Sequence, residues 1–370
     1  MIHSLKLKNF KPFAELQLPL QPLTLLSGLN STGKSSILQS LLLLRQSYQQ
    51  QLLPRIGLAL NGDLVNIGTA QDALFEAATE DAIEFQVIWK GDIKGVWRFD
   101  YNRESDVISI DPSLAIPETV YQTSLFSDTF HYLQADRIVP RPFFETSDFQ
   151  VRQHRQLGSR GEYTVDFLHT YQDKNIPNFK LKHPSAISLS LTDQVEAWIG
   201  EVSPGTRIKV TQNLNMDLMS LQYSYGLSNP YRPTNTGFGV TYTLPILVAI
   251  LASKPGTLIL IENPEAHLHP KGQAKMGELL ALAASCGIQI IIETHSDHVL
   301  NGIRLAVHDG KLSHNDVQLH YFQRVEEEGI AKSEVVSPSM DRNGRIDQWP
   351  DGFFDEWDNV LDALLEPAQD

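Results

Sequence analysis

The sequence predicts an α/β protein in which a mixed central sheet is flanked by helices. Near residue 30, an apolar strand, a glycine-rich turn and an apolar helix follow one another. Two continuous apolar strands, 257–262 and 288–293, then alternate with helical segments in the last third of the chain. Such strands are typical of parallel sheets that are covered on both faces, and their site lies at the carboxyl ends.

The glycine-rich turn runs from Gly28 to Ser36 and fits G-x-x-x-x-G-K-[ST], the pattern of a phosphate-binding loop. Glycines let main-chain N–H groups turn toward phosphate oxygens, and the helix N-terminus adds positive partial charge. We expect Lys34 to reach the β- and γ-phosphates of ATP and the Ser35 hydroxyl to bind Mg²⁺. The predicted phosphate-binding residues are Asn30, Ser31, Thr32, Gly33, Lys34, Ser35 and Ser36.

The other N-terminal elements are predicted to form an antiparallel β-layer beside the central sheet. Residues 2–8 largely alternate apolar and polar side chains, as a half-exposed strand does. Three later runs, 83–89, 95–101 and 106–110, are separated by turn-like links and indicate a meander. The helix that follows the phosphate loop is expected to end near Gln51, before Pro54.

Residues 118–235 are predicted to form a helical and irregular insertion. Part of it, 138–185, is rich in Pro, Arg, Phe and Gly. Within the insertion we expect helices at 118–130, 163–172 and 188–199, and strands at 131–134, 206–211 and 217–225.

The last third carries the predicted chemistry. The strand 257–262 ends in Glu262 and is a Walker B-like element, which places a carboxylate where Mg²⁺ must lie, so Ser35 and Glu262 are the predicted metal ligands. His295 follows the next strand, at a position able to contact a γ-phosphate or its attacking water. An ordinary loop histidine remains the alternative. A zinc site is also considered, although the spacing of its candidates matches no familiar zinc motif. Those candidates are Glu265, His267, His269, His295 and His298.

Composition limits the function classes. The 370 residues are 42% hydrophobic and 20% charged, which allows a sizeable core in one large domain or two ordinary ones. No signal peptide or transmembrane run is present and Cys286 is the single cysteine, so we expect a cytoplasmic protein without membrane contact.

Charge argues against nucleic acid as the default partner. The net charge of −14 repels DNA and RNA, so nucleic-acid binding would need a local basic patch. One candidate patch competes with an ordinary scatter of solvated arginines. It consists of Arg137, Arg141, Arg152, Arg155 and Arg160.

Taken together, these motifs resemble the ABC-type ATPase head, and within that group the OLD-like and Septu-type ATPases of bacterial defence systems. The similarity covers residues 1–50 and 235–360. The segments that carry it are Gly28–Ser36, Gly237–Gly239, Ile261–Pro270 and Glu293–Ser296, and Gly344–Phe354 resembles a small C-terminal domain of unknown function found on such ATPases.

The resemblance implies roles for further residues. Gln134 would be the Q-loop residue, 266–269 the D-loop and His295 the switch histidine. Gly237 and Gly239 would form the signature turn, which contacts the γ-phosphate of ATP on a second subunit. Because one chain carries one phosphate loop and one signature, the implied unit is a head-to-tail homodimer, or a higher oligomer, with ATP at its interfaces.

Two departures from the family pattern affect the expected activity. Asn263 stands where these ATPases usually have a catalytic glutamate, and an amide can orient water but cannot accept its proton. Glu265 can substitute, or hydrolysis is slow and the protein works as an ATP-held clamp. The predicted catalytic residues are therefore Glu262, Glu265, His295 and Asn263. The signature also reads Gly-Phe-Gly-Val instead of Ser-Gly-Gly-Gln, which makes its contact across the dimer less secure.

We therefore expect an ATPase domain at 1–310, divided at 117/118 and 235/236, and a small C-terminal domain at 311–370. The expected function is slow, Mg²⁺-dependent ATP hydrolysis in a dimer that regulates an effector, such as a nuclease, in antiviral defence. One alternative, a RecF- or SMC-like DNA-repair ATPase, is disfavoured by the charge and by the missing heptads. Another, a non-hydrolysing nucleotide-dependent scaffold, is favoured by Asn263. An OLD nuclease proper would need an appended metal-binding domain, and too little chain follows residue 310 to hold one.

Overall fold

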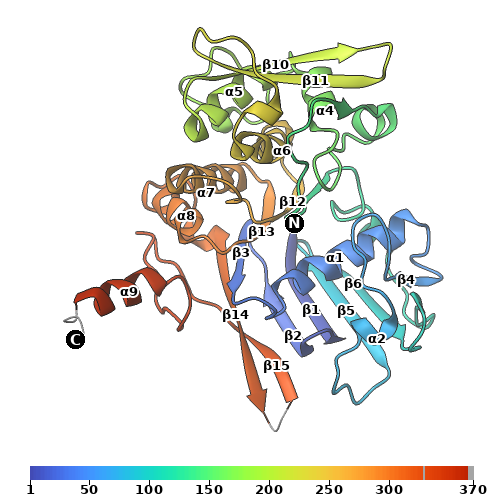
Figure 1. Cartoon of the computed structure of the whole chain (residues 1–370). Helices are drawn as coiled ribbons and strands as arrows, with labels where there is room; N and C mark the ends of the chain where they lie inside the picture. The colour runs from blue at the N-terminus through green and yellow to red at the C-terminus, as the bar shows by residue number, and fades with distance from the viewer. Residues whose placement is uncertain (328–329, 366–370) are drawn as a thin grey trace.

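A six-stranded mixed sheet forms the centre of the molecule (Figure 1). The computed structural model describes residues 1–327 and 330–365. Five strands are parallel to one another, and the sixth pairs antiparallel at one edge, which confirms the predicted mixed sheet. In spatial order the strands are β15 (Ile330–Val336), β14 (Val317–Glu327), β3 (Leu23–Gly28), β13 (Gln289–Glu293), β12 (Leu258–Glu262) and β8 (Phe130–Leu133).

The inner strands are apolar along their whole length because their two faces cover two separate cores. In β12, Ile259 and Ile261 pack into one core, whereas Leu258 and Leu260 pack into the other. The residues of β13 divide between the two cores in the same way. Since successive side chains of a strand point to opposite faces, both sets must be apolar.

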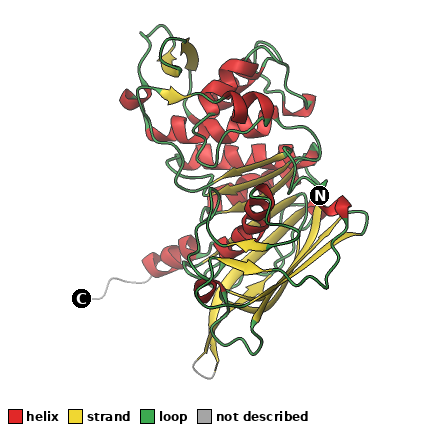
Figure 2. Cartoon of the chain, turned by 90° about the vertical axis from the view of Figure 1, so that its right-hand side faces the viewer, coloured by secondary structure: helices red, strands yellow, loops and turns green. Residues whose placement is uncertain are grey.

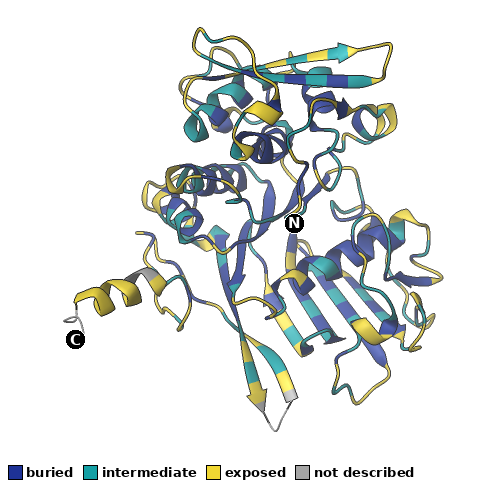
Figure 3. Cartoon of the chain, viewed as in Figure 1, coloured by how far each residue is buried: buried dark blue, intermediate teal, exposed yellow. Residues whose placement is uncertain are grey.

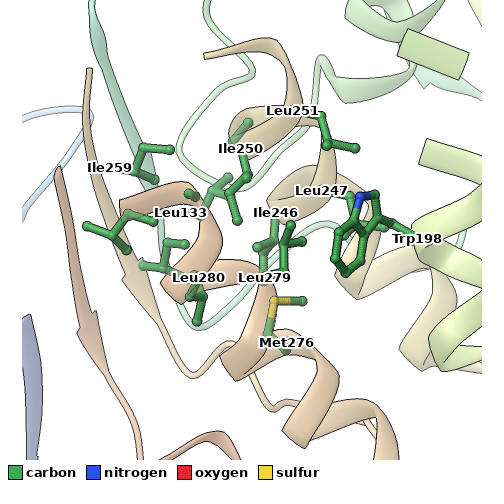
Figure 4. Close-up of a cluster of buried hydrophobic side chains, with 14 of the residues drawn as sticks. Leu133, Trp198, Ile246, Leu247, Ile250, Leu251, Ile259, Met276, Leu279 and Leu280 are labelled. Carbon is green, nitrogen blue, oxygen red and sulfur yellow. The ribbon is translucent and has the colours of Figure 1, made fainter. Parts of the chain in front are cut away.

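Helices α6 (Phe238–Ala252), α7 (Pro270–Ser285) and α8 (Asp297–His308) cover one face of the sheet. Figure 4 shows part of this core, in which Ile246 and Ile250 of α6 lie with Leu279 and Leu280 of α7 near the sheet. Helix α5 (Leu191–Val202) adds Trp198 to the same cluster, so the insertion shares its core with the sheet.

Helix α1 (Lys34–Gln49) and a four-stranded antiparallel layer cover the other face (Figure 2). This layer confirms the predicted β-layer, and its order is β2 (Phe13–Pro19), β1 (Ile2–Phe10), β5 (Ala82–Trp89) and β6 (Ile93–Asp100). The predicted meander is wrong in one respect. Strand β7 (Val107–Ser109) pairs with β4 (Gly57–Ala59), and beyond this short sheet a single bridge joins Phe99 to Ile110. The short helix α2 (Ala70–Ala73) lies in the same part of the chain.

The insertion begins with less helix than expected. The predicted helix at 118–130 is limited to α3 (Glu118–Tyr121). Beyond α3, the carbonyls of Leu125 and Ser127 accept hydrogen bonds from the buried Arg45 guanidinium, so this segment is held by a side chain. The remaining elements are β9 (Phe144–Glu145), a π-helix (Asp148–Gln153), α4 (Thr164–Tyr171), 3₁₀ helices Phe179–Leu181 and Pro233–Asn235, β10 (Thr206–Asn213) and β11 (Leu218–Tyr225), with β10, β11 and β9 forming a separate sheet.

The C-terminal part begins with a 3₁₀ helix (His314–Asp316) and then joins the central sheet. Strand β14 pairs in parallel with β3, the strand that leads into the phosphate loop. The expected domain boundary at 310/311 therefore does not separate two sheets. The two strands that follow it, β14 and β15, belong to the same sheet as the ATPase core. Helix α9 (Glu356–Leu365) projects from the body and exposes Leu364 and Leu365 (Figure 3). Residues 328–329 and 366–370 of the expected C-terminal domain lie outside the described residues.

Candidate nucleotide-binding site

The phosphate loop lies between β3 and α1, as its pattern predicts. Gly33 caps α1 in the left-handed region with φ 96°, and a Cβ there would lie 2.6 Å from the ring of Phe13. Only glycine fits this position without strain. The Nζ of Lys34 donates hydrogen bonds to the carbonyls of Gly28 at 2.9 Å and Leu29 at 2.7 Å. Burial lowers the pKa of Lys34. The loop therefore holds its lysine inside the turn, where phosphate oxygens would compete for it.

A cavity of about 520 Å³ opens over this loop. All seven predicted phosphate-binding residues line it, and the β-layer side contributes Lys11 and Asp72. The cavity therefore lies between the phosphate loop and the N-terminal layer. Its complete lining is Lys11, Pro12, Asn30–Ser36, Gln39, Asp72, Leu74, Glu76 and Glu293.

Two acidic residues end adjacent strands beside the loop. Glu262 of β12 and Glu293 of β13 are register partners at the carboxyl end of the sheet. The Oγ of Ser35 donates a hydrogen bond to Oε1 of Glu293 at 3.1 Å. Sequence reasoning missed Glu293, although the signal was present, because both acids end a continuous apolar run.

The Glu293 carboxyl group is buried. Burial raises its pKa to about 7, the hydrogen bond from Ser35 opposes this change, and the nearby charge of Glu262 adds to it. The carboxyl group therefore exchanges its proton near neutral pH when no cation compensates its charge.

Glu262 is held by the neighbouring strand β8 and by the turn after it. Its Oε1 accepts a hydrogen bond from the Tyr132 hydroxyl at 2.9 Å, and its Oε2 accepts one from the Ala135 N–H at 3.0 Å. Its main-chain carbonyl accepts a third from Arg137. The predicted Walker B-like acid is therefore fixed in place, with both oxygens already in hydrogen bonds.

A second, larger cavity of about 1420 Å³ meets the site from the side of the insertion. Ser35, Gln134 and Glu262 all line it. The N–H of Gln134 donates to the carbonyl of Ser159 at 2.9 Å, which ties the expected Q-loop residue to the insertion. The structure thus brings Gln134 to the same space as both expected metal ligands.

Glu265 lies against the loop that carries the expected switch histidine. Its Oε1 accepts from the N–H of His295 at 2.9 Å, and its Oε2 accepts from the Thr294 hydroxyl at 2.7 Å. Burial lowers the pKa of the His295 ring, and the charge of Lys34 acts in the same direction. Each oxygen of Glu265 accepts one hydrogen bond from this loop, so in this arrangement the carboxylate holds the main chain at His295.

Asn263 follows the Walker B-like strand in a left-handed conformation, with φ 45°. Its N–H donates to the carbonyl of Glu293 at 2.8 Å, and its carbonyl accepts from Arg137 at 2.7 Å. Its side chain lines neither of the two cavities described above. The main chain of Asn263 therefore joins the ends of β12 and β13.

The expected signature turn lies at the start of α6, against the expected D-loop of the same chain. A Cβ on Gly239 would lie 2.5 Å from the carbonyl oxygen of His267. The rings of Phe238 and Tyr242 pack on His267 at centroid distances of 5.5 and 4.7 Å. Neither cavity is lined by Gly237 or Gly239. The signature is therefore built into the fold but lies apart from the phosphate loop of its own chain.

The candidate arginine patch is not a free basic surface. Arg137 is fully buried. Arg141, Arg152 and Arg160 form ion pairs with Glu145, Asp148 and Asp136, respectively. Arg155 lies over the ring of Tyr171 with 4.4 Å to its centroid. Arg137 is therefore no part of a surface patch, and each of the other four arginines has an acidic or aromatic neighbour, which favours the alternative of a scatter of arginines.

The residues present fit ATP and Mg²⁺. The loop offers main-chain N–H groups, a lysine and a hydroxyl, and the adjacent acids offer the oxygen ligands that a hard cation requires. Among the described residues, no group of three or more His, Cys, Asp or Glu side chains is placed to hold a metal ion. The zinc alternative finds no support among them, whereas Mg²⁺ in such sites takes many of its ligands from phosphate and water.

The fold and the site together define a P-loop NTPase with an ABC-type ATPase head. A family model described as an AAA ATPase domain matches residues 1–187, half of the chain, and the chain belongs to this family. Its ATPase head is OLD-like. A further AAA domain model matches 202–301, and a model described as a protein of unknown function (DUF3696) matches 312–364.

A curated relative is an OLD nuclease from Thermus scotoductus (strain ATCC 700910 / SA-01), which is 26% identical over 329 residues. The match covers 80% of this chain and 59% of that protein, so the chain spans about three fifths of the relative's length.

Solved structures with a similar fold include heads of SMC proteins. The Smc head domain of Pyrococcus furiosus, with an extended coiled coil and bound to the C-terminal domain of ScpA, has a TM-score of 0.52 at 13% identity, covering 99% of both chains. The SMC head domain of Thermotoga maritima has a TM-score of 0.49 at 13% identity and covers 90% of this chain and 98% of that one. At this identity the Pyrococcus likeness shows the fold alone.

Among the described residues, no helix has both the length and the apolar character to cross a bilayer.

Proposed function

We propose that this chain binds ATP with Mg²⁺ and hydrolyses it slowly. The observation that carries the proposal is the junction of three adjacent strand ends. Strand β3 supplies the phosphate loop with Lys34 and Ser35, β13 supplies Glu293 and β12 supplies Glu262. Phosphate oxygens and a hard cation both find complementary groups there.

In this proposal each residue has a separate task. Lys34 and the loop N–H groups hold the β- and γ-phosphates, and Ser35 and Glu262 hold Mg²⁺, directly or through water. When bound, Mg²⁺ neutralises the charge of the phosphates. Gln134 reaches the same space from the insertion side. His295 lines neither cavity in this arrangement, and the loop after β13 would have to bring it to the γ-phosphate or the attacking water.

The proposed rate is low because the residue directly after the Walker B-like strand is an amide, and because Glu265 is directed toward the loop that carries His295. Asn263 cannot accept a proton, and both oxygens of Glu265 already accept hydrogen bonds from the switch loop. The same observations favour a second candidate function, in which the chain is a non-hydrolysing scaffold that responds to bound nucleotide.

The proposed active unit is a cytoplasmic head-to-tail homodimer, or a higher oligomer, with ATP between subunits. The position of Gly237 and Gly239 supports it, because these glycines line neither cavity of their own chain. A second subunit's phosphate loop would then be their partner. ATP-driven opening and closing would regulate an effector, such as a nuclease, in antiphage defence. The similarity to an OLD nuclease supports this choice of effector.

A RecF- or SMC-like role on DNA is less well supported. The arginines of the candidate patch are buried, ion-paired or stacked on an aromatic ring, and the net charge is −14.

For the domain organisation we propose an ATPase domain at 1–310, followed by a C-terminal domain at 311–370 whose first strands extend the central sheet.

ATP turnover and nucleotide binding by the purified protein test the proposal. We expect slow phosphate release in wild type that Lys34→Ala abolishes, because the only lysine on the phosphate loop is removed. Lys254→Ala is the matched control, since Lys254 is exposed and lines neither cavity. Turnover that survives Lys34→Ala would contradict the assignment of this loop. Tight binding without any turnover in wild type would favour the scaffold.

Sedimentation velocity tests the proposed dimer. Adenylyl imidodiphosphate with Mg²⁺ is expected to convert the wild-type protein to a larger species, and Lys34→Ala is expected to remain unchanged. If nucleotide leaves the sedimentation coefficients of both proteins unchanged, an ATP-held dimer is ruled out.

A further inference from the structure

Glu293 lies between the phosphate-loop strand and the Walker B-like strand. Its own strand, β13, pairs with β3 on one side and with β12 on the other. In register, Glu293 is the partner of Leu26 and of Glu262. Ile291, two residues earlier, belongs to the core on the α1 face. Since side chains alternate along a strand, Glu293 points to that same face, toward the first turn of α1.

The two carboxylate oxygens of Glu293 have different surroundings. Oε1 accepts the hydrogen bond from Ser35 at 3.1 Å. Oε2 is buried and has no hydrogen-bond partner among the described residues. The residue is 8% exposed, and it lines the same cavity as Lys34 and Ser35. A buried carboxylate oxygen without a donor is costly while the group is charged, so a cation or a polar ligand in the adjacent cavity would stabilise the charged form.

We propose that Glu293 is a second acidic residue of the magnesium site, which holds the Ser35 hydroxyl on one oxygen and water of the metal's hydration shell on the other. The inference rests on the proposed function, because it adds a residue to the same site. Mg²⁺ keeps several waters and binds through one or two carboxylates and phosphate oxygens.

Glu262 remains an expected metal ligand, but it has less acceptor capacity left than Glu293 for binding further water. Its two oxygens already accept hydrogen bonds from Tyr132 and Ala135. Glu293 shares only one of its oxygens, and the donor is the expected metal ligand Ser35 itself. Residues that orient the ligands of a metal in this way set its affinity.

Metal affinity measured without turnover tests the inference. Wild type and the variants Glu293→Gln and Glu293→Asp are each saturated with adenylyl imidodiphosphate, and Mn²⁺ binding is followed by electron paramagnetic resonance. Glu278→Gln is the control, because Glu278 is a partly buried acid that bonds to Lys275 and Lys311 and lines neither cavity. We expect Glu293→Gln to weaken Mn²⁺ binding by about tenfold, Glu293→Asp to weaken it less, and the control to match wild type.

The outcomes separate this inference from the proposed function. Mn²⁺ affinity in Glu293→Gln within about twofold of wild type overturns the inference. Equal losses of Mn²⁺ affinity in Glu293→Gln and Glu293→Asp also overturn the inference, because they would assign the loss to altered packing and not to the missing charge. Nucleotide affinity in the absence of metal is measured alongside, and we expect Glu293→Gln to keep or improve it, since a negative charge near the phosphates is removed. Failure of the wild-type protein to bind nucleotide counts against the proposed function itself.

Discussion

The guanidinium group of Arg137 donates a hydrogen bond to the main-chain carbonyl of Glu262, with 2.6 Å between Nη1 and the oxygen. The same side chain reaches the carbonyls of Gln134 and Asn263, at 3.2 and 2.7 Å. It is fully buried, and its guanidinium carbon lies 5.4 Å from the ring centroid of Tyr242 in α6. Arg137 therefore joins the end of the Walker B-like strand, the expected Q-loop and the helix of the signature.

Replacing Arg137 by lysine is expected to lower the free energy of unfolding by about 2–4 kcal/mol, because a lysine cannot reach three carbonyls that are then left buried without a donor. Urea unfolding measures the change. Arg141→Lys is the control, since Arg141 forms only a surface ion pair with Glu145, and we expect less than about 1 kcal/mol there. Equal stability of the two variants would show that the Arg137 contacts contribute nothing.

Much of the fold was predictable because its strands are covered on both faces. The runs 257–262 and 288–293 have to be apolar throughout, since alternate residues such as Ile259 and Leu260 enter different cores. That requirement leaves a pattern in the sequence. The pairing of β14 with β3 left no such local signal, because it joins the segment 317–322 to the segment 23–28, at opposite ends of the chain.

The site was predictable where a residue lies within a motif, and not where it acts through the tertiary structure. Lys34 and Ser35 belong to a fixed local pattern. Glu293 lies beside the phosphate loop only because β13 lies between β3 and β12, which is a property of the sheet order. The burial of Arg137 could not be predicted for the same reason, since its partners include the carbonyls of residues 262 and 263.

The close approach of Gly239 to the His267 carbonyl predicts a steric effect. In Gly239→Ala the new Cβ would meet that oxygen at 2.5 Å, so the start of α6 or the expected D-loop must move. We expect a loss of about 1–3 kcal/mol in stability, measured by urea unfolding. Gly237→Ala is the matched control, because a Cβ there meets nothing within 4 Å. A loss as large in Gly237→Ala would place the cause in helix capping and not in the contact with His267.

The paired hydrogen bonds of Glu265 predict that it acts by positioning His295. Glu265→Ala removes both acceptors, so we expect turnover to fall and His295 to become more mobile. The pH dependence of the remaining turnover is expected to keep its wild-type shape, because no proton-accepting group is lost. Steady-state rates between about pH 6 and 9 provide the measurement. Loss of the acidic limb of the profile in Glu265→Ala would identify Glu265 as the base instead.

The buried ring of His320 predicts acid sensitivity. Its Nε2 donates to the carbonyl of Pro19, its Nδ1 accepts from the Ser337 hydroxyl, and burial lowers its pKa to about 4. In the unfolded chain the pKa returns to about 6.5, so between these values the unfolded state binds more protons. The contribution of His320 to stability is therefore fully present above about pH 6.5 and falls as the pH decreases toward about 4, by about 3 kcal/mol in total.

Urea unfolding at a series of pH values measures this effect. His320→Asn is expected to be less stable than wild type at neutral pH, because the two hydrogen bonds are disturbed, but to lose less further stability on acidification. His131, whose pKa is also lowered to about 4 by burial, accounts for part of the slope that remains. His3→Gln, at an exposed position, should keep the wild-type dependence. An unchanged slope in His320→Asn would mean that the ring is solvated or already protonated in the native protein, and the coupling between β14 and the end of β2 would have to be reassigned.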